Sequence, residues 1–257
     1  MIVMTNGVAQ ELWNARVNNT KLASNFAGSP GTEDEAYDIQ QAMIAASGLA
    51  VTGWKIGATV EALFEALGVS QPFLGPLFQR FTHNSGSELQ VLPGHSIETE
   101  MTVRLQSDLI YRERPYDRSE IESAVAAIHP SFEIVGARFE GELAGAGFRL
   151  IADGGANIGT VLGKEVRNWS GLDLANYPVN LSINGNTVHE GNTSVLLWDH
   201  IFDALTWCLR HPVLSQRGLR AGDLIMTGTC TGITPISPGD KAEADFGEMG
   251  EVSVRFI

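Results

Sequence analysis

The sequence of 257 residues lacks several features that would place it in a special class of protein. Its only cysteines, Cys208 and Cys230, cannot supply the disulfide framework on which small secreted proteins depend. No apolar run approaches the roughly 20 residues that a transmembrane helix needs. The first residues have no basic stretch followed by an apolar one, so we see no signal peptide. We therefore expect a cytoplasmic protein that does not enter a membrane.

Positive charge is also scarce. The chain has 17 Lys and Arg against 30 Asp and Glu, which gives a formal net charge of −13. Nucleic acids and anionic membranes are bound by clusters of Lys and Arg, so we expect neither as a partner. A small anionic substrate is still compatible with this charge, because a bound metal and a few cations can hold one locally.

Two helix starts are predicted from capping patterns. Thr32 is followed three residues later by Glu35, which is the pattern of a capping box at the start of a helix. Ser119 and Glu122 repeat this pattern, and we expect their helix to end before Pro130. The residues before the break at Ser-Pro-Gly also recur at helical spacing, so the chain should begin with a helix.

Strands are predicted where short apolar runs are bounded by glycine and proline. We expect strands over residues 51–57, 97–105 and 132–135, and an irregular loop over 71–77. The dipeptide Asn184-Gly185 lies between two apolar runs, which is a strong signal for a β-hairpin. Such a mixture indicates an α+β fold whose sheet is a sandwich or a barrel.

No composition shift divides the chain into two independent cores. The first helices nevertheless resemble an attachment to the strand-rich remainder. We therefore expect residues 1–50 to form an N-terminal helical subdomain and residues 51–257 to form a single catalytic unit.

Glu98 and Glu100 are the most informative pair in the sequence. They stand two apart in a predicted strand, so their side chains point to the same face. Two neighbouring carboxylates repel each other unless something neutralises them. A hard divalent cation such as Mg²⁺ would do so, because it prefers carboxylate oxygens. The competing interpretation is an ordinary half-buried strand with a solvated acidic face.

Two further charged residues lie in apolar strands. Glu133 is the only carboxylate in its strand, and it could add a third oxygen ligand to the first two. Taken alone, Glu133 fits better as one half of a salt bridge to Arg138 or another cation, since buried carboxylates are usually paired. Lys55 lies between Trp54 and Ile56, where a buried lysine would need a partner and would suggest function. It could instead extend outward with its stem packed on Trp54.

Two glycine-rich turns could contact a substrate. Thr229 lies in Thr-Gly-Thr-Cys-Thr after an apolar strand, where hydroxyls and backbone N–H groups could hold a carboxylate. Asp153 precedes Gly154-Gly155 at a predicted strand end. Either segment could be a plain turn. Together with Arg138, these two residues are our candidate substrate-binding residues.

Several of these segments occur in an order that a known family shares. They are Gly53-Trp-Lys-Ile-Gly-Ala-Thr59, Pro72-Phe-Leu-Gly-Pro-Leu77, Ile97-Glu-Thr-Glu100, His129-Pro-Ser-Phe-Glu-Ile-Val135, Ile151-Ala-Asp153, Leu219-Arg-Ala-Gly-Asp223 and Thr227-Gly-Thr-Cys-Thr231. From about residue 35 to its end, the chain resembles the fumarylacetoacetate hydrolase superfamily. It is most similar to the branch of 2-keto-4-pentenoate hydratase and 4-oxalocrotonate decarboxylase.

The resemblance implies a mixed β-sandwich roll with an N-terminal helical part. It also implies a Mg²⁺ or Mn²⁺ site formed by Glu98, Glu100 and Glu133, with Lys55 as an active-site lysine. Thr229 would lie near the substrate carboxylate. Members of the family are commonly homo-oligomers, so we expect one here.

The activity implied is that of a metal-dependent lyase in aromatic catabolism. Its substrate would be a small 2-oxo acid or 2-hydroxy-dienoate, which it would hydrate or decarboxylate. The alternatives are a carbon–carbon hydrolase of the acylpyruvate or fumarylpyruvate type and a catalytically silent metal-binding homologue. The chain departs from the hydratase branch at 77–81, which lacks an acidic pair, and at 136–138, which reads Gly-Ala-Arg rather than Asp-Ser-Arg. The sequence therefore does not identify the acid/base partner for hydration.

Overall fold

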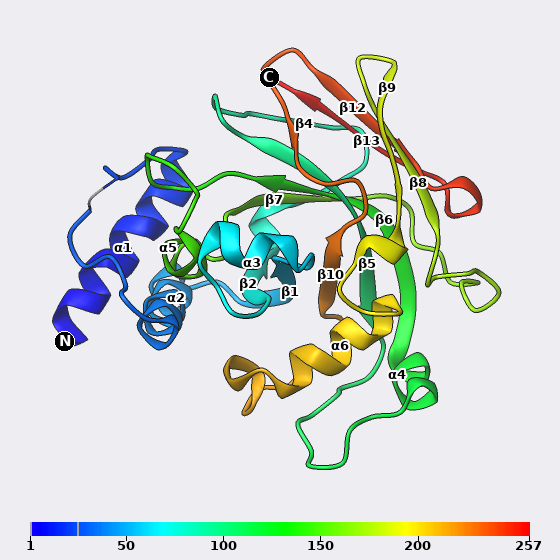
Figure 1. Ribbon diagram of the computed structural model, residues 1–257, viewed down its shortest axis with the longest axis horizontal. Coiled ribbons are helices and arrows are strands. Elements are labelled where there is room, and N and C mark those ends of the chain that lie inside the picture. The colour runs from blue at the N-terminus through cyan, green and yellow to red at the C-terminus, as the bar shows by residue number, and fades with distance from the viewer. Residues whose placement is uncertain (1, 25) are drawn as a thin grey trace.

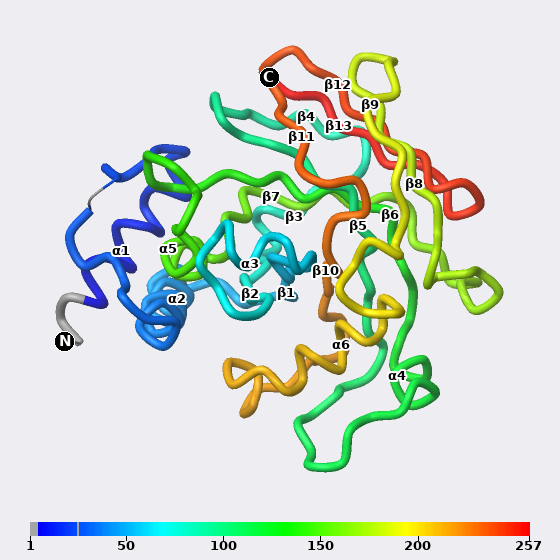
Figure 2. Tube along the Cα trace, in the orientation of Figure 1, coloured from blue at the N-terminus to red at the C-terminus, as the bar shows by residue number. Residues whose placement is uncertain are grey.

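The computed structural model describes residues 2–24 and 26–257. Within these ranges the chain forms six α-helices, joined by strands and by a few short 3₁₀ turns. The helices are α1 (Ile2–Asn18), α2 (Glu33–Ser47), α3 (Ala62–Leu67), α4 (Arg118–Ala124), α5 (Gly147–Ala152) and α6 (Ile201–Arg210). Figures 1 and 2 show α1 and α2 together at one end of the molecule.

The helix predicted after Thr32 is confirmed. The hydroxyl of Thr32 accepts a hydrogen bond from the backbone N–H of Glu35 at 3.2 Å, as an N-cap should. In the usual capping box the Glu carboxylate accepts from the N–H of the cap residue itself. Here the carboxylate of Glu35 accepts instead from the N–H of Gly31, one residue before the cap, at 2.8 Å. The first bond satisfies a backbone N–H that a helix start would otherwise leave unpaired, and the second ties the residue before the cap to the first turn.

The helix predicted to start at Ser119 was placed wrongly. The cap is Asp117, which forms a capping box with Glu120, and α4 ends at Ala124. The next residues belong to a strand that includes Pro130. In a strand, the N–H and the carbonyl of one residue point to the same side. The carbonyl of Pro130 accepts from the N–H of Gly163, just beyond the end of β7. The N–H that proline lacks would therefore also face the side where β7 has ended, so Pro130 is tolerated. Pairing between strands therefore overrides the local helix signal.

The larger sheet has eight strands. Their order is β2-β1-β10-β5-β6-β7-β3, and β11 pairs with β5. Most neighbours are antiparallel, but β1 runs parallel to β10 and β3 runs parallel to β7. The strands are β1 (Val51–Gly57), β2 (Phe73–Phe78), β3 (Thr82–Asn84), β5 (Ser96–Leu105), β6 (Val125–Val135), β7 (Asn157–Leu162), β10 (Leu224–Thr229) and β11 (Thr234–Pro235).

Two segments of this region differ from their prediction. Residues 73–78 form β2 rather than an irregular loop, and they tolerate Gly75 and Pro76 because β2 is the edge strand of the sheet. Residues 147–152 form α5 rather than the end of a strand. Short apolar runs do not distinguish a buried strand from a buried helix by periodicity.

The smaller sheet has five strands in the order β4-β13-β12-β8-β9. The predicted hairpin at Asn184-Gly185 is confirmed, because it joins β8 to β9 with φ values of 53° and 80°. Positive φ at both residues is typical of a type I′ turn. The strands are β4 (Ser87–Leu89), β8 (Pro178–Ile183), β9 (Asn186–Asn192), β12 (Lys241–Asp245) and β13 (Glu251–Phe256).

A single hydrophobic core joins the helices to both sheets. Leu12 of α1 and Met43 of α2 are fully buried in the same cluster as Phe132 of β6 and Val254 of β13. The first two helices are thus packed into the core, and their treatment as a separate subdomain of residues 1–50 stays a prediction. Across the described residues, no helix combines the length and apolarity needed to cross a bilayer.

Candidate active site

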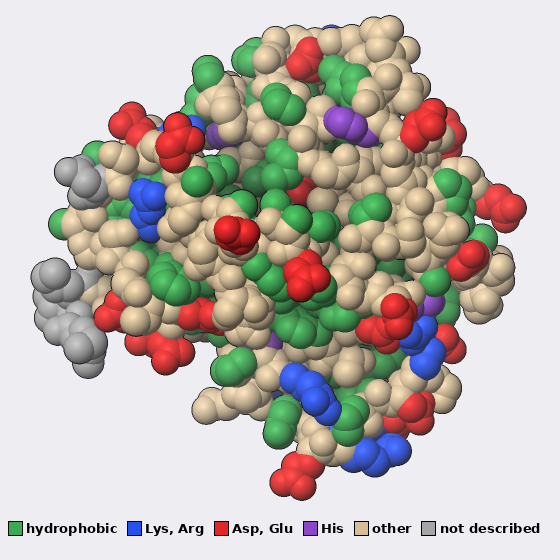
Figure 3. Space-filling model, in the orientation of Figure 1, with side chains coloured by type: hydrophobic (Ala, Val, Ile, Leu, Met, Phe, Trp, Pro, Cys, Tyr) green, Lys and Arg blue, Asp and Glu red, His purple; other side chains and the backbone are tan. Residues whose placement is uncertain are grey.

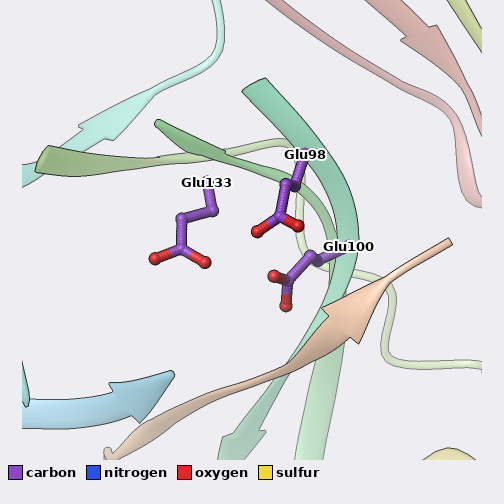
Figure 4. A group of neighbouring side chains, drawn as sticks. All are labelled: Glu98, Glu100 and Glu133. Carbon is purple, nitrogen blue, oxygen red and sulfur yellow. The ribbon is translucent and has the colours of Figure 1, made fainter. Parts of the chain in front are cut away.

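Three glutamates from two neighbouring strands converge on one point. Glu98 and Glu100 lie on β5, and Glu133 lies directly opposite Glu98 on β6. Figure 4 shows the three carboxylates pointing into a common space. One oxygen of each lies within 4.8 Å of the others. The spacing of two in β5 and the register of β5 against β6 therefore create the cluster.

This cluster is buried and electrostatically unfavourable on its own. Glu98, Glu100 and Glu133 are 8%, 1% and 0% exposed. Burial, together with the nearby Glu133, raises the pKa of Glu98 to about 7. Burial and both other glutamates hold the pKa of Glu100 well above its usual range. Carboxylates in this position need a proton or a cation between them.

The donor set fits a hard divalent cation. All three side chains offer carboxylate oxygens, which are the ligands that Mg²⁺ and Mn²⁺ prefer. The Oε1 atom of Glu100 is buried and has no hydrogen-bond partner, so a ligand position is open there. The arrangement leaves further coordination positions for water or a substrate.

Lys55 supplies the positive charge beside the cluster. It lies on β1, is 3% exposed, and places Nζ 3.2 Å from Oε2 of Glu133. Burial alone would lower the pKa of Lys55, but the attraction of the three glutamates outweighs burial and raises it. The stem passes Gly155, whose φ is +76° and where a Cβ would lie 2.9 Å from Cδ of Lys55. The glycine thus makes room for the lysine.

A chain of hydrogen bonds holds Glu133 from behind. Asn157 donates from Nδ2 to Oε1 of Glu133 at 2.9 Å, and Arg16 donates from Nη2 to Oδ1 of Asn157, also at 2.9 Å. Neither Arg16 nor Asn157 was predicted from the sequence as part of the site. Asn157 closes the glycine turn that follows Asp153, and Arg16 is a charged residue on the buried face of α1. The glycine turn before Asn157 and the charged residue on the apolar face of the first helix can both be seen in the sequence, and either could have pointed to a residue that supports a metal ligand.

Glu100 is held by the turn at the end of β10. The N–H of Gly228 donates to Oε2 of Glu100 at 2.7 Å. Gly228 has φ +110°, and a Cβ there would lie 2.1 Å from Oγ1 of Thr59. Thr229 is the strand partner of Glu100, and its hydroxyl donates to the carbonyl of Gly232 at 3.0 Å. The threonine-glycine motif therefore positions a glutamate as well as facing the cleft.

Gly228→Ala is expected to weaken both the fold and metal binding. The new methyl group would collide with Thr59, and the backbone would resist the φ that lets it donate to Glu100. Gly232→Ala is the matched control, because its φ of +76° is also positive but a Cβ there meets open space. Chemical unfolding should show Gly228→Ala less stable than Gly232→Ala by about 1–3 kcal/mol. Equal stability would mean that Thr59 simply moves aside.

Lys55 and Glu98 line an apolar cleft whose free volume is about 90 Å³. Lys55, Thr59, Glu98 and Thr229 are its polar members, and Nζ of Lys55 lies 5.7 Å from the centre of the Phe73 ring. Figure 3 shows hydrophobic side chains around the middle of this face, with acidic side chains both among them and at its periphery. The apolar walls are formed by Leu63, Leu67, Phe73, Val135, Leu143 and Ile233.

Arg138 and Asp153 lie outside this cleft. They are 2% and 0% exposed and form a buried ion pair, with Nη1 of Arg138 2.8 Å from Oδ1 of Asp153. Arg138 also donates from its backbone N–H to Oδ2 of Asp153 and from Nη2 to the carbonyl of Asn157. This geometry gives the two residues a supporting position beneath Asn157, and their assignment as substrate-binding residues stays a prediction.

The positions of the missing acidic residues are informative. Gln79 and Arg80 are exposed at the end of β2, and neither is among the described residues that line the cleft. Gly136 packs against the ring of His95, leaving no room for a side chain. Cys230 is buried, and burial raises the pKa of its thiol, so the thiolate needed for nucleophilic attack is disfavoured.

Comparison with known proteins now decides the family. Residues 81–257 match the family described as fumarylacetoacetate (FAA) hydrolase, C-terminal. The chain belongs to this family. It is also similar along nearly all its length to a 2-keto-4-pentenoate hydratase of Paraburkholderia xenovorans (strain LB400), with 30% identity over 96% of this chain and 93% of that protein.

Two further comparisons agree with this membership. A 4-oxalocrotonate decarboxylase of Pseudomonas sp. (strain CF600) is 27% identical over 87% of this chain and 85% of its own. Among solved structures, the 4-oxalocrotonate decarboxylase from Pseudomonas putida G7, complexed with magnesium and adipate, covers 100% of this chain and 98% of its own. Its TM-score is 0.90 at 24% identity, which confirms the fold of this member of the fumarylacetoacetate hydrolase family.

Proposed function

We propose that this protein is a divalent-metal-dependent lyase that hydrates or decarboxylates a 2-oxo acid or 2-hydroxy-dienoate. The observation that carries the proposal is the convergence of Glu98, Glu100 and Glu133 beside Lys55, with Lys55 and Glu98 lining an apolar cleft. The names of the similar hydratases and of the similar decarboxylase support this class of reaction. A catalytically silent homologue would have no need to retain the buried lysine, though a fold alone guarantees no activity.

The three glutamates would hold Mg²⁺ or Mn²⁺, and Mg²⁺ is our first choice. When bound, such a cation supplies Lewis-acid stabilisation of negative charge on a 2-oxo oxygen. Glu133 would be oriented for this task by Asn157, and Glu100 by the N–H of Gly228. These second partners fix the carboxylates before any ligand arrives.

Lys55 would act on the substrate from the same side. The three glutamates keep it protonated, so it can hold a substrate carboxylate or donate a proton to a carbon next to the enolate. Thr229 lines the cleft near Glu98 and would contact the substrate carboxylate. The apolar walls would exclude water from the reacting atoms, which strengthens each of these charge interactions.

The cleft favours a substrate whose far end carries no charge. Lys55 is the one cation among the described residues that line it, and it already lies beside the glutamates. A second carboxylate on the substrate tail would meet Leu63, Leu143 and Ile233 rather than a partner, and burying an unpaired charge is costly. We therefore favour hydration of a monocarboxylate over decarboxylation of a dicarboxylate.

Product analysis with three substrates tests this proposal. The metal-loaded protein is incubated with 2-hydroxypenta-2,4-dienoate, 2-oxohex-3-enedioate and an acylpyruvate. We expect the monocarboxylate dienoate to show at least a tenfold higher kcat/KM than the dicarboxylate, which corresponds to about 1.4 kcal/mol of transition-state binding. Cleavage of the acylpyruvate would instead favour a hydrolase, although the described cleft lining includes no histidine to activate water. Turnover of none would favour the silent homologue.

The proposal also covers the location of the protein, its oligomeric state and its domain organisation. We propose that the protein works in the cytoplasm, that it forms a homo-oligomer and that residues 1–50 act as a helical attachment to a catalytic unit of residues 51–257. Light scattering of the full chain measures the oligomer directly. A monomer at micromolar concentration would contradict that part.

A further inference from the structure

A second buried site lies on the α1 side of the metal ligands. It is a small cavity whose free volume is about 20 Å³, which is room for about one water-sized particle. The charged and ionisable side chains that line it are Arg16, Lys21, His95 and Arg138. No Asp or Glu is among its described lining residues. The ionisable groups of this cavity are thus all cations or hydrogen-bond donors, set beside apolar side chains such as Leu92 and Ile158.

The two arginines at this cavity have donors without partners. Arg16 is 6% exposed and Arg138 is 2% exposed. Nε and Nη1 of Arg16 and Nε of Arg138 make no hydrogen bond, although all three atoms are buried. An unsatisfied buried donor is costly, and more so on a charged group. Burial and the neighbouring Arg138 hold the pKa of Arg16 well below its usual range, which reflects the same missing partner.

His95 contributes another donor to this cavity. Its Nδ1 accepts a hydrogen bond from the backbone N–H of Leu92 at 3.2 Å. The hydrogen of the neutral ring is therefore assigned to Nε2. Burial, followed by the charges of Lys21 and Arg138, lowers the pKa of His95 to about 4, so the ring is neutral at pH 7. A neutral imidazole with one N–H can donate to an anion without adding positive charge.

We propose that this cavity, which we call the Arg16–Arg138 cavity, binds one small monovalent anion of the size of chloride. A water molecule would fit, but it would leave the charge uncompensated. Two buried carboxylates act on Arg16, but Asp153 is paired with Arg138 and Glu133 with Lys55, so the charge of Arg16 has no carboxylate of its own. A monovalent anion balances that charge and gives the buried donors an acceptor. The size of the cavity excludes polyatomic organic anions such as gluconate.

The anion should also strengthen metal binding. Arg16 reaches Glu133 through Asn157, and Arg138 donates to the carbonyl of the same asparagine. An anion in the Arg16–Arg138 cavity would screen two positive charges that oppose a cation at the glutamates. Coupling of this kind is reciprocal, and its usual size is about 5- to 150-fold in affinity. This part alone rests on the proposed metal site, whereas the cavity itself does not.

Bromide in place of chloride tests occupancy directly. Crystals of the full chain grown with bromide and Mn²⁺ should show an anomalous bromide peak between Arg16 and Arg138. A water molecule there, or a carboxylate from a second copy of the chain, would overturn the proposal. The bromide concentration in the crystal is then lowered to the range in which the rise in melting temperature saturates in solution. Loss of the peak at that concentration would mean an adventitious ion only, which also overturns the proposal.

The solution test compares chloride with gluconate at constant ionic strength. We expect chloride to raise the melting temperature saturably and to tighten Mn²⁺ binding about fivefold or more, measured by Mn²⁺ electron paramagnetic resonance. Arg16→Met should abolish both effects, and Lys21→Ala, at an exposed position that should not disturb folding, should weaken both. Lys164→Ala removes an equally exposed lysine outside the cavity and is the matched control. A melting temperature that is the same in both salts would overturn the anion site. A chloride effect on melting without one on Mn²⁺ would overturn the coupling alone.

Discussion

Replacing Glu98 and Glu100 together by glutamine should abolish the stabilisation of this protein by Mg²⁺ or Mn²⁺. A metal at one hundred times its dissociation constant stabilises a folded protein by about 2.7 kcal/mol. The two glutamines keep the volume of the side chains but remove two of the three anionic ligands. Turnover should fall by about three powers of ten, because Lewis-acid stabilisation supplies several kcal/mol.

Without metal, the same double variant is expected to lose no stability. Without metal, the wild-type protein holds three buried carboxylates close together, and burial and mutual repulsion make their ionised forms unfavourable. Removing two of them should therefore leave the metal-free variant at least as stable as the metal-free wild type. Thermal unfolding with and without chelator measures both effects. This pair of results separates loss of a ligand from simple damage to the fold.

Glu61→Gln with Glu65→Gln is the matched control for this experiment. These glutamates are exposed at the start and within α3, beside the cleft but outside the cluster. The control makes the same change in charge and should keep both the metal response and the turnover. If the double variant at Glu98 and Glu100 still responded to metal as the wild type does, the proposed ligand set would be wrong.

Part of this site could be predicted from the sequence, because alternation along a strand is local. The spacing of Glu98 and Glu100 already placed both side chains on one face of β5. The position of Glu133 is different, since it depends on the register of β6 against β5, which no local pattern encodes. The family resemblance brought Glu133 into the ligand set before the register was known.

The errors also share a physical cause. The helix expected after Ser119 gives way to β6 because β5 pairs with the start of that strand, at residues 125–128. Residues 73–78, expected as an irregular loop, form β2 because they pair with β1. In each case, pairing with a strand that is distant in sequence decided the structure. The local propensity of the residues is only a weak guide at such positions.

The missing carboxylates concentrate the proton chemistry on one residue. The exposed Gln79 and Arg80 occupy the stretch where the hydratase branch often has acidic residues, and Gly136 has no side chain to offer. Within the described cleft lining, Lys55 and Glu98 are the ionisable groups. Glu98 is engaged as a proposed metal ligand, so Lys55 is left as the group that can move a proton.

Lys55→Ala is therefore expected to lower kcat/KM by about 10²- to 10⁴-fold, the range for loss of a general acid or base. The assay requires saturating metal, because without it the variant would leave the buried Glu133 with no cationic partner. Lys164→Ala is again the control, and it should retain full activity. An unchanged rate in Lys55→Ala would remove this lysine from the mechanism.

Separate measurement of kcat and KM for Lys55→Ala then distinguishes the two roles open to Lys55, substrate binding and proton transfer. If the ammonium group only holds the substrate carboxylate, KM should rise while kcat changes little. If it moves a proton, kcat should fall, and small amines that diffuse into the space left by the side chain should restore it. Lys55 lines the cleft, so this space is reachable from the substrate side. Rescue that follows the pKa of the added amine would assign proton transfer to Lys55, the one ionisable group of the described cleft lining that is not a proposed metal ligand.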